Sequence, residues 1–299
     1  MSLRLALLSR WLRLTERRML ARARDPAPLR RRFERQAQLL PAPRGARREN
    51  VLVAGRPALR VTGAGTGAED SAGMLLHFHG GAYVFGSPRT HWKMLARLSA
   101  ATGCPALLPD YRLAPEHPFP AAFADALAIW EEICTRFDPG RVVIGGDSAG
   151  GGLALALLAE ILRRDLPRPA GTYAMSPFTD MTLSGASLRE NAARDALLPA
   201  SRMADLRDLV LFGADPDDWR ASPLEAEFTG AGPVWLSCSE TEILRDDTLR
   251  LASRLRGQGI RTTLHVAKDV PHAWPIFGGI LPEADAALAD LADWVVALR

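Results

Sequence analysis

The sequence predicts an α/β protein built on a mainly parallel, eight-stranded sheet with helices on both faces. Short apolar runs that read as strands alternate with helical patterns of about ten to fifteen residues from Met74 onward, an order typical of strand–helix–strand units. The 299 residues are 47% hydrophobic and 24% charged, as in ordinary globular proteins. This composition excludes disordered, collagen-like and coiled-coil chains.

The first residues predict an amphipathic helix over residues 3–22, with leucines on one face and arginines on another at helical spacing. Residues 1–48 hold fourteen arginines against three acidic residues, a balance of +11, so the rest of the chain carries −8 and the total is +3. We interpret the basic stretch as a solvated helix face, with weak contact to an anionic membrane surface as the alternative. We do not expect a nucleic-acid partner. A Pro- and Arg-rich connection through Pro41 and Pro43 follows.

The remaining elements follow in order along the chain. We expect strands at residues 51–54, 58–61, 74–79, 106–108, 141–144, 171–175, 234–237 and 262–266, and helices at residues 88–101, 120–136, 149–164, 247–256 and 282–298. No apolar run approaches the roughly 20 residues of a membrane span. Three cysteines without CxxC spacing predict neither a disulfide framework nor a zinc site. Because no signal peptide is recognisable, we expect a cytoplasmic setting.

The strongest chemical signal follows the strand that ends near Ile144. There Gly146-x-Ser148-x-Gly150 joins a strand to a helix, the context of a nucleophile elbow. The turn is so tight that a Cβ at either glycine would collide with neighbouring backbone, and it lifts the serine hydroxyl out at the top of the sheet. The alternatives are a phosphate-binding loop, disfavoured because no Lys is present, and a close-packing turn. Ser148 is therefore the candidate nucleophile.

A serine needs a base to remove its proton. In folds with this succession of strands and helices, the acid and then the histidine come after the serine along the chain. His272 lies in the loop after the last strand and is the candidate base, whereas His265 lies within that strand and is more simply structural. The acid is expected after the strand 234–237. Asp246 and Asp247 have a simpler explanation as helix caps. Spacing alone does not choose between Glu240 and Glu242.

Backbone amides must also stabilise the negative oxygen of a tetrahedral intermediate. One donor is Ala149, directly after the serine, and the others are expected in the loop after strand 74–79, which reads His79-Gly80-Gly81-Ala82-Tyr83. His77 and His79 share a strand face and could bind a metal, but no third ligand follows at useful spacing. We therefore expect neither a metal nor a cofactor.

Together these motifs resemble the hormone-sensitive lipase-like branch of the α/β-hydrolases, a group of serine carboxylesterases. The resemblance covers roughly residues 74–299 and rests on His79-Gly-Gly-Ala82, on Asp110-Tyr-Arg-Leu-Ala-Pro-Glu-His117-Pro-Phe-Pro120, on Gly146-Asp-Ser-Ala-Gly-Gly151, and on later blocks at Ser176–Asp180, Glu242–Asp246 and His272–Trp274.

The resemblance implies an α/β-hydrolase fold with a helical cap, made of residues 1–48 and an insertion at about residues 178–225, over a catalytic domain of residues 49–299. In such a cap, Leu8, Trp11, Leu12 and Phe33 would line or cover an apolar entrance. It also implies a homodimer through the last strand and helix. The substrate it implies is a small hydrophobic ester with a short or medium acyl chain.

Carried over residue by residue, the resemblance implies the roles of the site. Ser148, Glu242 and His272 match its catalytic triad; Gly80, Gly81, Ala82 and Ala149 match its oxyanion loop and elbow; and His79 and Asp147 match supporting positions. Two departures stand out, Ala82 in place of the usual third glycine and Glu rather than the commoner Asp as acid. Lactone or acetyl-group hydrolysis by the same triad, and a non-catalytic small-molecule binder on this fold, are the alternative functions. The serine elbow disfavours an epoxide or haloalkane hydrolase, and a capped site disfavours a peptidase.

Overall fold

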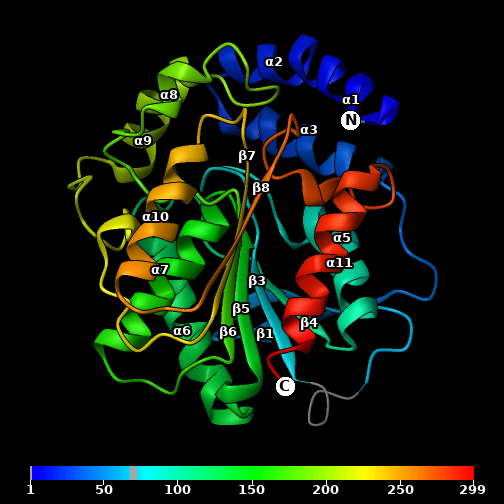
Figure 1. Cartoon of the computed structure of the whole chain (residues 1–299), viewed down its shortest axis with the longest axis vertical. Helices are drawn as coiled ribbons and strands as arrows, with labels where there is room; N and C mark the ends of the chain where they lie inside the picture. The colour runs from blue at the N-terminus through cyan, green and yellow to red at the C-terminus, as the bar shows by residue number, and fades with distance from the viewer. Residues whose placement is uncertain (1, 68–72) are drawn as a thin grey trace.

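The computed structural model describes residues 2–67 and 73–299, which form an α/β structure around one sheet (Figure 1). The sheet has eight strands, as predicted, in the order β1-β2-β4-β3-β5-β6-β7-β8. Strands β3 to β8 are parallel, and β2 runs antiparallel to both β1 and β4. The strands are β1 (Arg47–Val53), β2 (Arg56–Thr62), β3 (Met74–Phe78), β4 (Ala106–Pro109), β5 (Val142–Asp147), β6 (Gly171–Met175), β7 (Val234–Ser239) and β8 (Thr262–Ala267).

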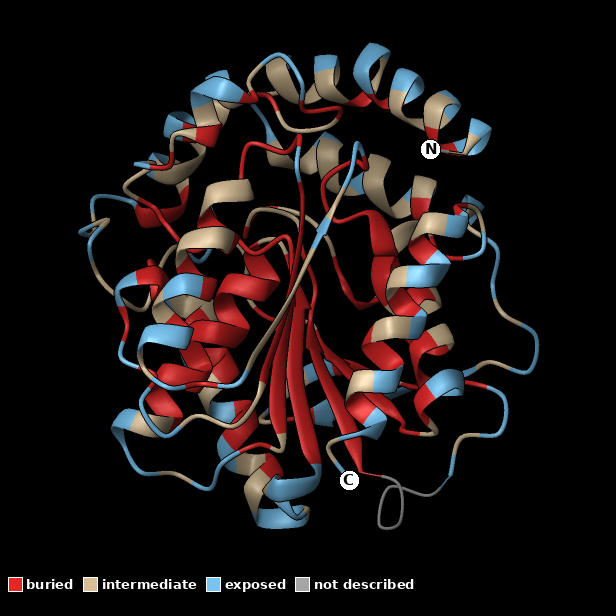
Figure 2. Ribbon diagram, in the orientation of Figure 1, coloured by how far each residue is buried: buried red, intermediate tan, exposed pale blue. Residues whose placement is uncertain are grey.

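Helices cover both faces of this sheet (Figure 1). They are α1 (Leu3–Leu14), α2 (Glu16–Arg22), α3 (Pro26–Leu39), α5 (Pro88–Thr102), α6 (Ala121–Arg136), α7 (Ala149–Arg163), α8 (Ser187–Glu190), α9 (Met203–Leu211), α10 (Arg245–Gly257) and α11 (Pro282–Val296). The side chains of successive strand residues point to opposite faces of the sheet. Leu75 packs in the cluster of α5 and α11, while Leu76 packs in the cluster of α6 and α7. Figure 2 shows the central strands as buried throughout, which explains why their sequences are nearly all apolar.

The N-terminal residues differ from the prediction in two ways. The expected helix over residues 3–22 breaks at Thr15, whose hydroxyl donates to the carbonyl of Trp11 at 2.8 Å. Helix α3 lies where we expected a connection. Its start was readable, because Asp25 accepts a hydrogen bond from the Ala27 amide at 2.9 Å and Pro26 is the first helical residue.

Two segments lie over the carboxyl ends of the parallel strands (Figure 1). We call α1 to α3 with their connections, residues 2–46, the N-terminal segment, and residues 178–225, between β6 and β7, the insertion. Leu5 on α1 is fully buried against Val270 and Trp274. Trp11 instead lies on the outward side of α1 with 43% of its surface exposed. No helix within the described ranges is long and apolar enough to cross a bilayer.

Candidate active site

Ser148 occupies the turn between β5 and α7. Its backbone has φ 53° and ψ −122°, a conformation that residues with a side chain rarely adopt. Two hydrogen bonds hold it there: the Ser148 amide donates to the carbonyl of Met175 at 2.9 Å, and the Phe178 amide donates to the carbonyl of Ser148 at 3.0 Å. The sharp turn therefore presents the hydroxyl above the sheet.

The flanking glycines are required by space, as the sequence predicted. A Cβ at Gly146 would overlap the backbone of Gly150, and a Cβ at Gly150 would overlap the carbonyl of Phe78 on the neighbouring strand. Because β3 pairs directly with β5, the loop after β3 lies beside the elbow. The strand order thus brings the serine and the glycine-rich loop together.

Ser148, His272 and Glu242 form one hydrogen-bonded chain. The Oγ of Ser148 is 2.8 Å from Nε2 of His272, and Nδ1 of His272 is 2.7 Å from Oε2 of Glu242. His272 and Glu242 are almost fully buried. They meet because β7 and β8 pair in parallel and their following loops start side by side. Glu240, the rival acid, is exposed, and its backbone amide donates to the carbonyl of Ala267 on the neighbouring strand.

The environment of His272 decides its protonation and tautomer. Burial lowers the pKa of His272, but the hydrogen bond and the negative charge of Glu242 outweigh burial and set the pKa above its ordinary value of 6.5. Since a carboxylate only accepts hydrogen bonds, Nδ1 carries the proton donated to Glu242. In the neutral ring the lone pair of Nε2 then faces the serine hydroxyl, as a general base requires.

Two buried side chains of the insertion hold the loop that carries Glu242. The Nδ2 of Asn191 donates to the carbonyls of Glu240 and Glu242, both at 2.9 Å. The Oδ2 of Asp195 accepts from the amide of Ile243 at 2.8 Å, and burial raises the pKa of Asp195. Sequence reasoning missed both residues. Their partners lie some 50 positions along the chain, so no local pattern indicates the contact.

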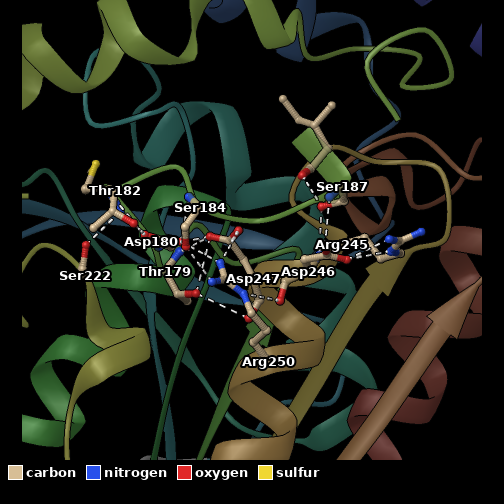
Figure 3. Close-up of polar contacts among 12 residues, drawn as sticks. Thr179, Asp180, Thr182, Ser184, Ser187, Ser222, Arg245, Asp246, Asp247 and Arg250 are labelled. Atoms are coloured by element: carbon tan, nitrogen blue, oxygen red, sulfur yellow. Dashed lines mark hydrogen bonds and ion pairs between the residues drawn. The ribbon is translucent and has the colours of Figure 1, made fainter. Parts of the chain in front are cut away.

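Asp246 and Asp247 were expected to cap a helix, and this prediction is wrong. Helix α10 begins at Arg245 with no side-chain cap. Asp247 instead accepts hydrogen bonds from the amides of Thr179 and Asp180 at 2.8 and 3.1 Å, and Asp246 accepts one from the Ser187 amide at 2.9 Å (Figure 3). Both carboxylates therefore fasten the start of the insertion to the body of the protein.

The loop after β3 turns its backbone amides toward the elbow through left-handed conformations. Gly81 has φ 123° and Ala82 has φ 58°. The Gly80 amide donates to Oδ1 of Asp147 at 3.0 Å, so it is already engaged, contrary to the expectation that it contributes to an oxyanion hole. In the described part of the chain, the amides of Gly81, Ala82 and Ala149 have no acceptor.

The supporting residues form a buried histidine cluster under this loop. Nδ1 of His79 is 2.9 Å from the carbonyl of Gly80, and burial lowers the pKa of His79 to about 3, so the neutral ring donates to that carbonyl. Asp147 is 3.2 Å from Nε2 of His77 and 3.3 Å from Nε2 of His91. Burial raises the pKa of Asp147, but its two histidine partners outweigh burial and hold the pKa far below the ordinary value. Among residues 2–67 and 73–299, no group of three histidine, cysteine or acidic side chains is arranged so that it could hold a metal ion.

Comparisons with known proteins identify the family of the chain. Residues 75–276 match the family described as alpha/beta hydrolase fold. The chain is 35% identical over 215 residues to an acetyl-hydrolase of Streptomyces hygroscopicus, and the match covers 72% of both chains. It is 32% identical over 227 residues to an esterase of Acinetobacter venetianus, and that match covers 75% of both chains. A crystal structure of an esterase from the bacterial hormone-sensitive lipase family is 34% identical and superposes with a TM-score of 0.93, covering 100% of this chain and 99% of that one. The chain therefore belongs to the α/β-hydrolases, and within them to the hormone-sensitive lipase family of esterases.

Proposed function

We propose that this protein is a serine carboxylesterase in which Ser148 is the nucleophile, His272 the general base and Glu242 the acid. The observation that carries this proposal is the continuous chain from the Ser148 hydroxyl through His272 to the Glu242 carboxylate, with contacts of 2.8 and 2.7 Å. A chain of this order is what activates a serine hydroxyl.

The first half of the reaction forms an acyl-enzyme. Oγ of Ser148 attacks the ester carbonyl carbon while Nε2 of His272 takes the hydroxyl proton, and Glu242 stabilises the imidazolium that results. The amides of Gly81, Ala82 and Ala149 donate to the oxygen that becomes negative. The bond to the alcohol then breaks, and His272 gives its proton to the leaving alcohol oxygen.

The second half repeats these steps with water. His272 takes a proton from water, the resulting hydroxide attacks the acyl carbon, and the bond to Ser148 breaks as its oxygen regains the proton. The side chains and amides named above account for every proton and every developing charge. The proposed mechanism therefore uses no cofactor.

We expect a small hydrophobic ester with a short acyl chain as substrate. The N-terminal segment and the insertion lie over the carboxyl ends of the strands and would act as the cap that excludes water (Figure 1). The acetyl-hydrolase of Streptomyces hygroscopicus, to which the chain is 35% identical, supports a short acyl group.

Hydrolysis of p-nitrophenyl esters from acetate to laurate tests the proposal. We expect the rate to be highest with short chains and Ser148→Ala to lower kcat by at least about 10³-fold. Glu242→Gln should lower kcat strongly, while Glu240→Gln, its matched control, should leave it unchanged. A folded wild-type protein that hydrolyses no ester and forms no adduct with a serine-directed phosphonate would falsify the proposal.

Two finer expectations belong to the same proposal. The half-buried edge strand β8, with α11, is the surface through which we expect a homodimer. In the described part of the chain, Cys104, Cys134 and Cys238 form no disulfide, which suits the reducing cytoplasmic setting that we expect.

A further inference from the structure

The outward side of α1 carries a stripe of exposed apolar side chains. Leu3, Leu7, Trp11 and Leu14 are 76, 62, 43 and 48% exposed, and their spacing of four, four and three residues puts them on one side of the helix. They are four of the nine large hydrophobic side chains that the described residues leave exposed. Such a concentration on one short helix marks an interaction surface rather than scattered exposure.

The inward side of α1 already has its packing partners. Leu5 and Leu12 are buried, and Leu5 packs against Val270 and Trp274. Ser2 donates two hydrogen bonds to the carboxylate of Glu283, at 2.7 and 2.9 Å. The helix is therefore fastened to the body through its inward side, and its outward stripe has no place in the protein's own core.

Exposed cations without acidic partners lie on α1, on α2 and just after α2. Arg10, Arg18, Arg22 and Arg24 are exposed, and none forms an ion pair within the described part of the chain. The acidic side chains of this region are used elsewhere: Glu16 pairs with Arg32, Asp25 caps α3, and Glu34 bonds Ser87 and Arg89. Figure 2 shows exposed positions along α1 and α2, separated by half-buried ones.

We propose that α1 and α2 dock on the surface of an anionic phospholipid bilayer, with α1 lying in the plane of the interface. The apolar stripe with its tryptophan would enter the boundary between headgroups and acyl chains, and the free arginines would contact the lipid phosphates. The positive charge beside an apolar stripe favours an anionic bilayer over the other possible partners. A second copy would bring two arginine-rich faces together, and a nucleic acid would leave the leucines without a partner.

Vesicle sedimentation of the full chain in about 0.1 M salt tests the proposal. The two probes are vesicles of phosphatidylcholine alone and vesicles with about a quarter phosphatidylglycerol. We expect binding to the anionic vesicles, at least about tenfold weaker binding to the neutral ones, and release by high salt. Each of Arg10→Gln and Arg18→Gln should weaken binding about fivefold.

The apolar part is tested by the triple variant Leu3→Ser, Leu7→Ser, Leu14→Ser, which should weaken vesicle binding at least about tenfold. The matched control is Phe212→Ser with Leu52→Ser, which removes exposed apolar side chains elsewhere and should leave binding unchanged. Circular dichroism and Tm check that each variant is folded. Equal affinity for both vesicle types, or an unaffected triple variant, overturns the proposal. So does light scattering in which the triple variant turns a dimer into a monomer while no vesicle is bound.

Discussion

The N-terminal segment and the insertion both lie over the candidate active site, but they are fastened to the protein by opposite chemistry. Several polar contacts of the N-terminal segment are made by partly exposed arginines: Arg13 donates to the carbonyl of Arg194 at 2.9 Å, and Arg30 donates to the carbonyl of Ala114 at 2.8 Å and pairs with Glu116. The insertion is tied through buried groups such as Asp247, Asp195 and Asn191, which bind backbone amides and carbonyls.

The difference predicts how each segment behaves. An arginine that is partly exposed can exchange its carbonyl partner for water, so each tie contributes little to the free energy of unfolding. A buried amide or carbonyl that loses its partner stays unsatisfied and costs more. We therefore expect the insertion to unfold with the sheet and the N-terminal segment to open separately.

The largest expected effect concerns Asp247. Burial first, and then the charge of Asp180, raises its pKa to about 7 against the favourable effects of the Thr179 and Asp180 amides and of Arg250. The folded state then holds a proton that the unfolded state has released. Stability should therefore fall as pH rises from about 4 to about 7, by on the order of 2–4 kcal/mol.

Urea unfolding of the wild type and of Asp247→Asn across this pH range measures the effect. The variant keeps an acceptor for the amides but has no proton to lose. As pH rises, the wild type should therefore lose stability relative to Asp247→Asn. Asp217→Asn, at an exposed position in the insertion, is the matched control. A difference that is constant from pH 4 to pH 7 would show that Asp247 does not titrate there.

The next effect concerns Asn191, which we expect to position the acid loop. Asn191→Ala leaves the carbonyls of Glu240 and Glu242 without their donor and should lower the free energy of unfolding by about 2 kcal/mol. The proposed function adds a second readout, because a displaced Glu242 supports the imidazolium less well. The kinetic pKa seen in kcat/KM should then move down, which a purely structural role would not cause. Arg189→Ala, at an exposed neighbouring position, is the control.

The pH profile of the wild type tests whether Glu242 raises the pKa of His272. Because the pKa of His272 lies above 6.5 and only the neutral ring accepts the serine proton, kcat/KM should rise with pH through a value above 6.5. Glu242→Gln removes the charge that raises this pKa and should shift the rise to lower pH. A profile with the same midpoint in both proteins contradicts the assignment of Glu242.

The smallest expected effect concerns the polar contacts of the N-terminal segment. Arg13→Ala and Glu116→Ala each remove a partly exposed tie of the N-terminal segment and should lower the free energy of unfolding by less than about 1 kcal/mol. Hydrogen exchange should nevertheless speed up in α1 to α3 while β5 and β6 stay protected. Losses as large as that of Asn191→Ala would mean that the two segments are equally integral to the fold.

Local signals explain what could be predicted from the sequence. Hydrophobic periodicity indicated the strands, the elbow glycines indicated Ser148, and the loop after the last strand indicated His272. Spacing did not separate Glu240 from Glu242, and only the family resemblance favoured Glu242, since two positions on one loop differ only in where the folded chain turns them. Asp246 and Asp247 were misread for the same reason, because capping is a local rule and their partners at residues 179–187 are distant in sequence.

One contact also bears on biosynthesis. Leu5, near the start of this sequence, is buried against Val270 and Trp274, on either side of His272. While the ribosome is still making the middle of the chain, α1 has no surface for its inward leucines, so both of its apolar sides are open to solvent. We expect the nascent chain to attract chaperones or lipid at this helix. The candidate active site is complete only after the loop around His272 has emerged, and only then does Leu5 find its packing partners.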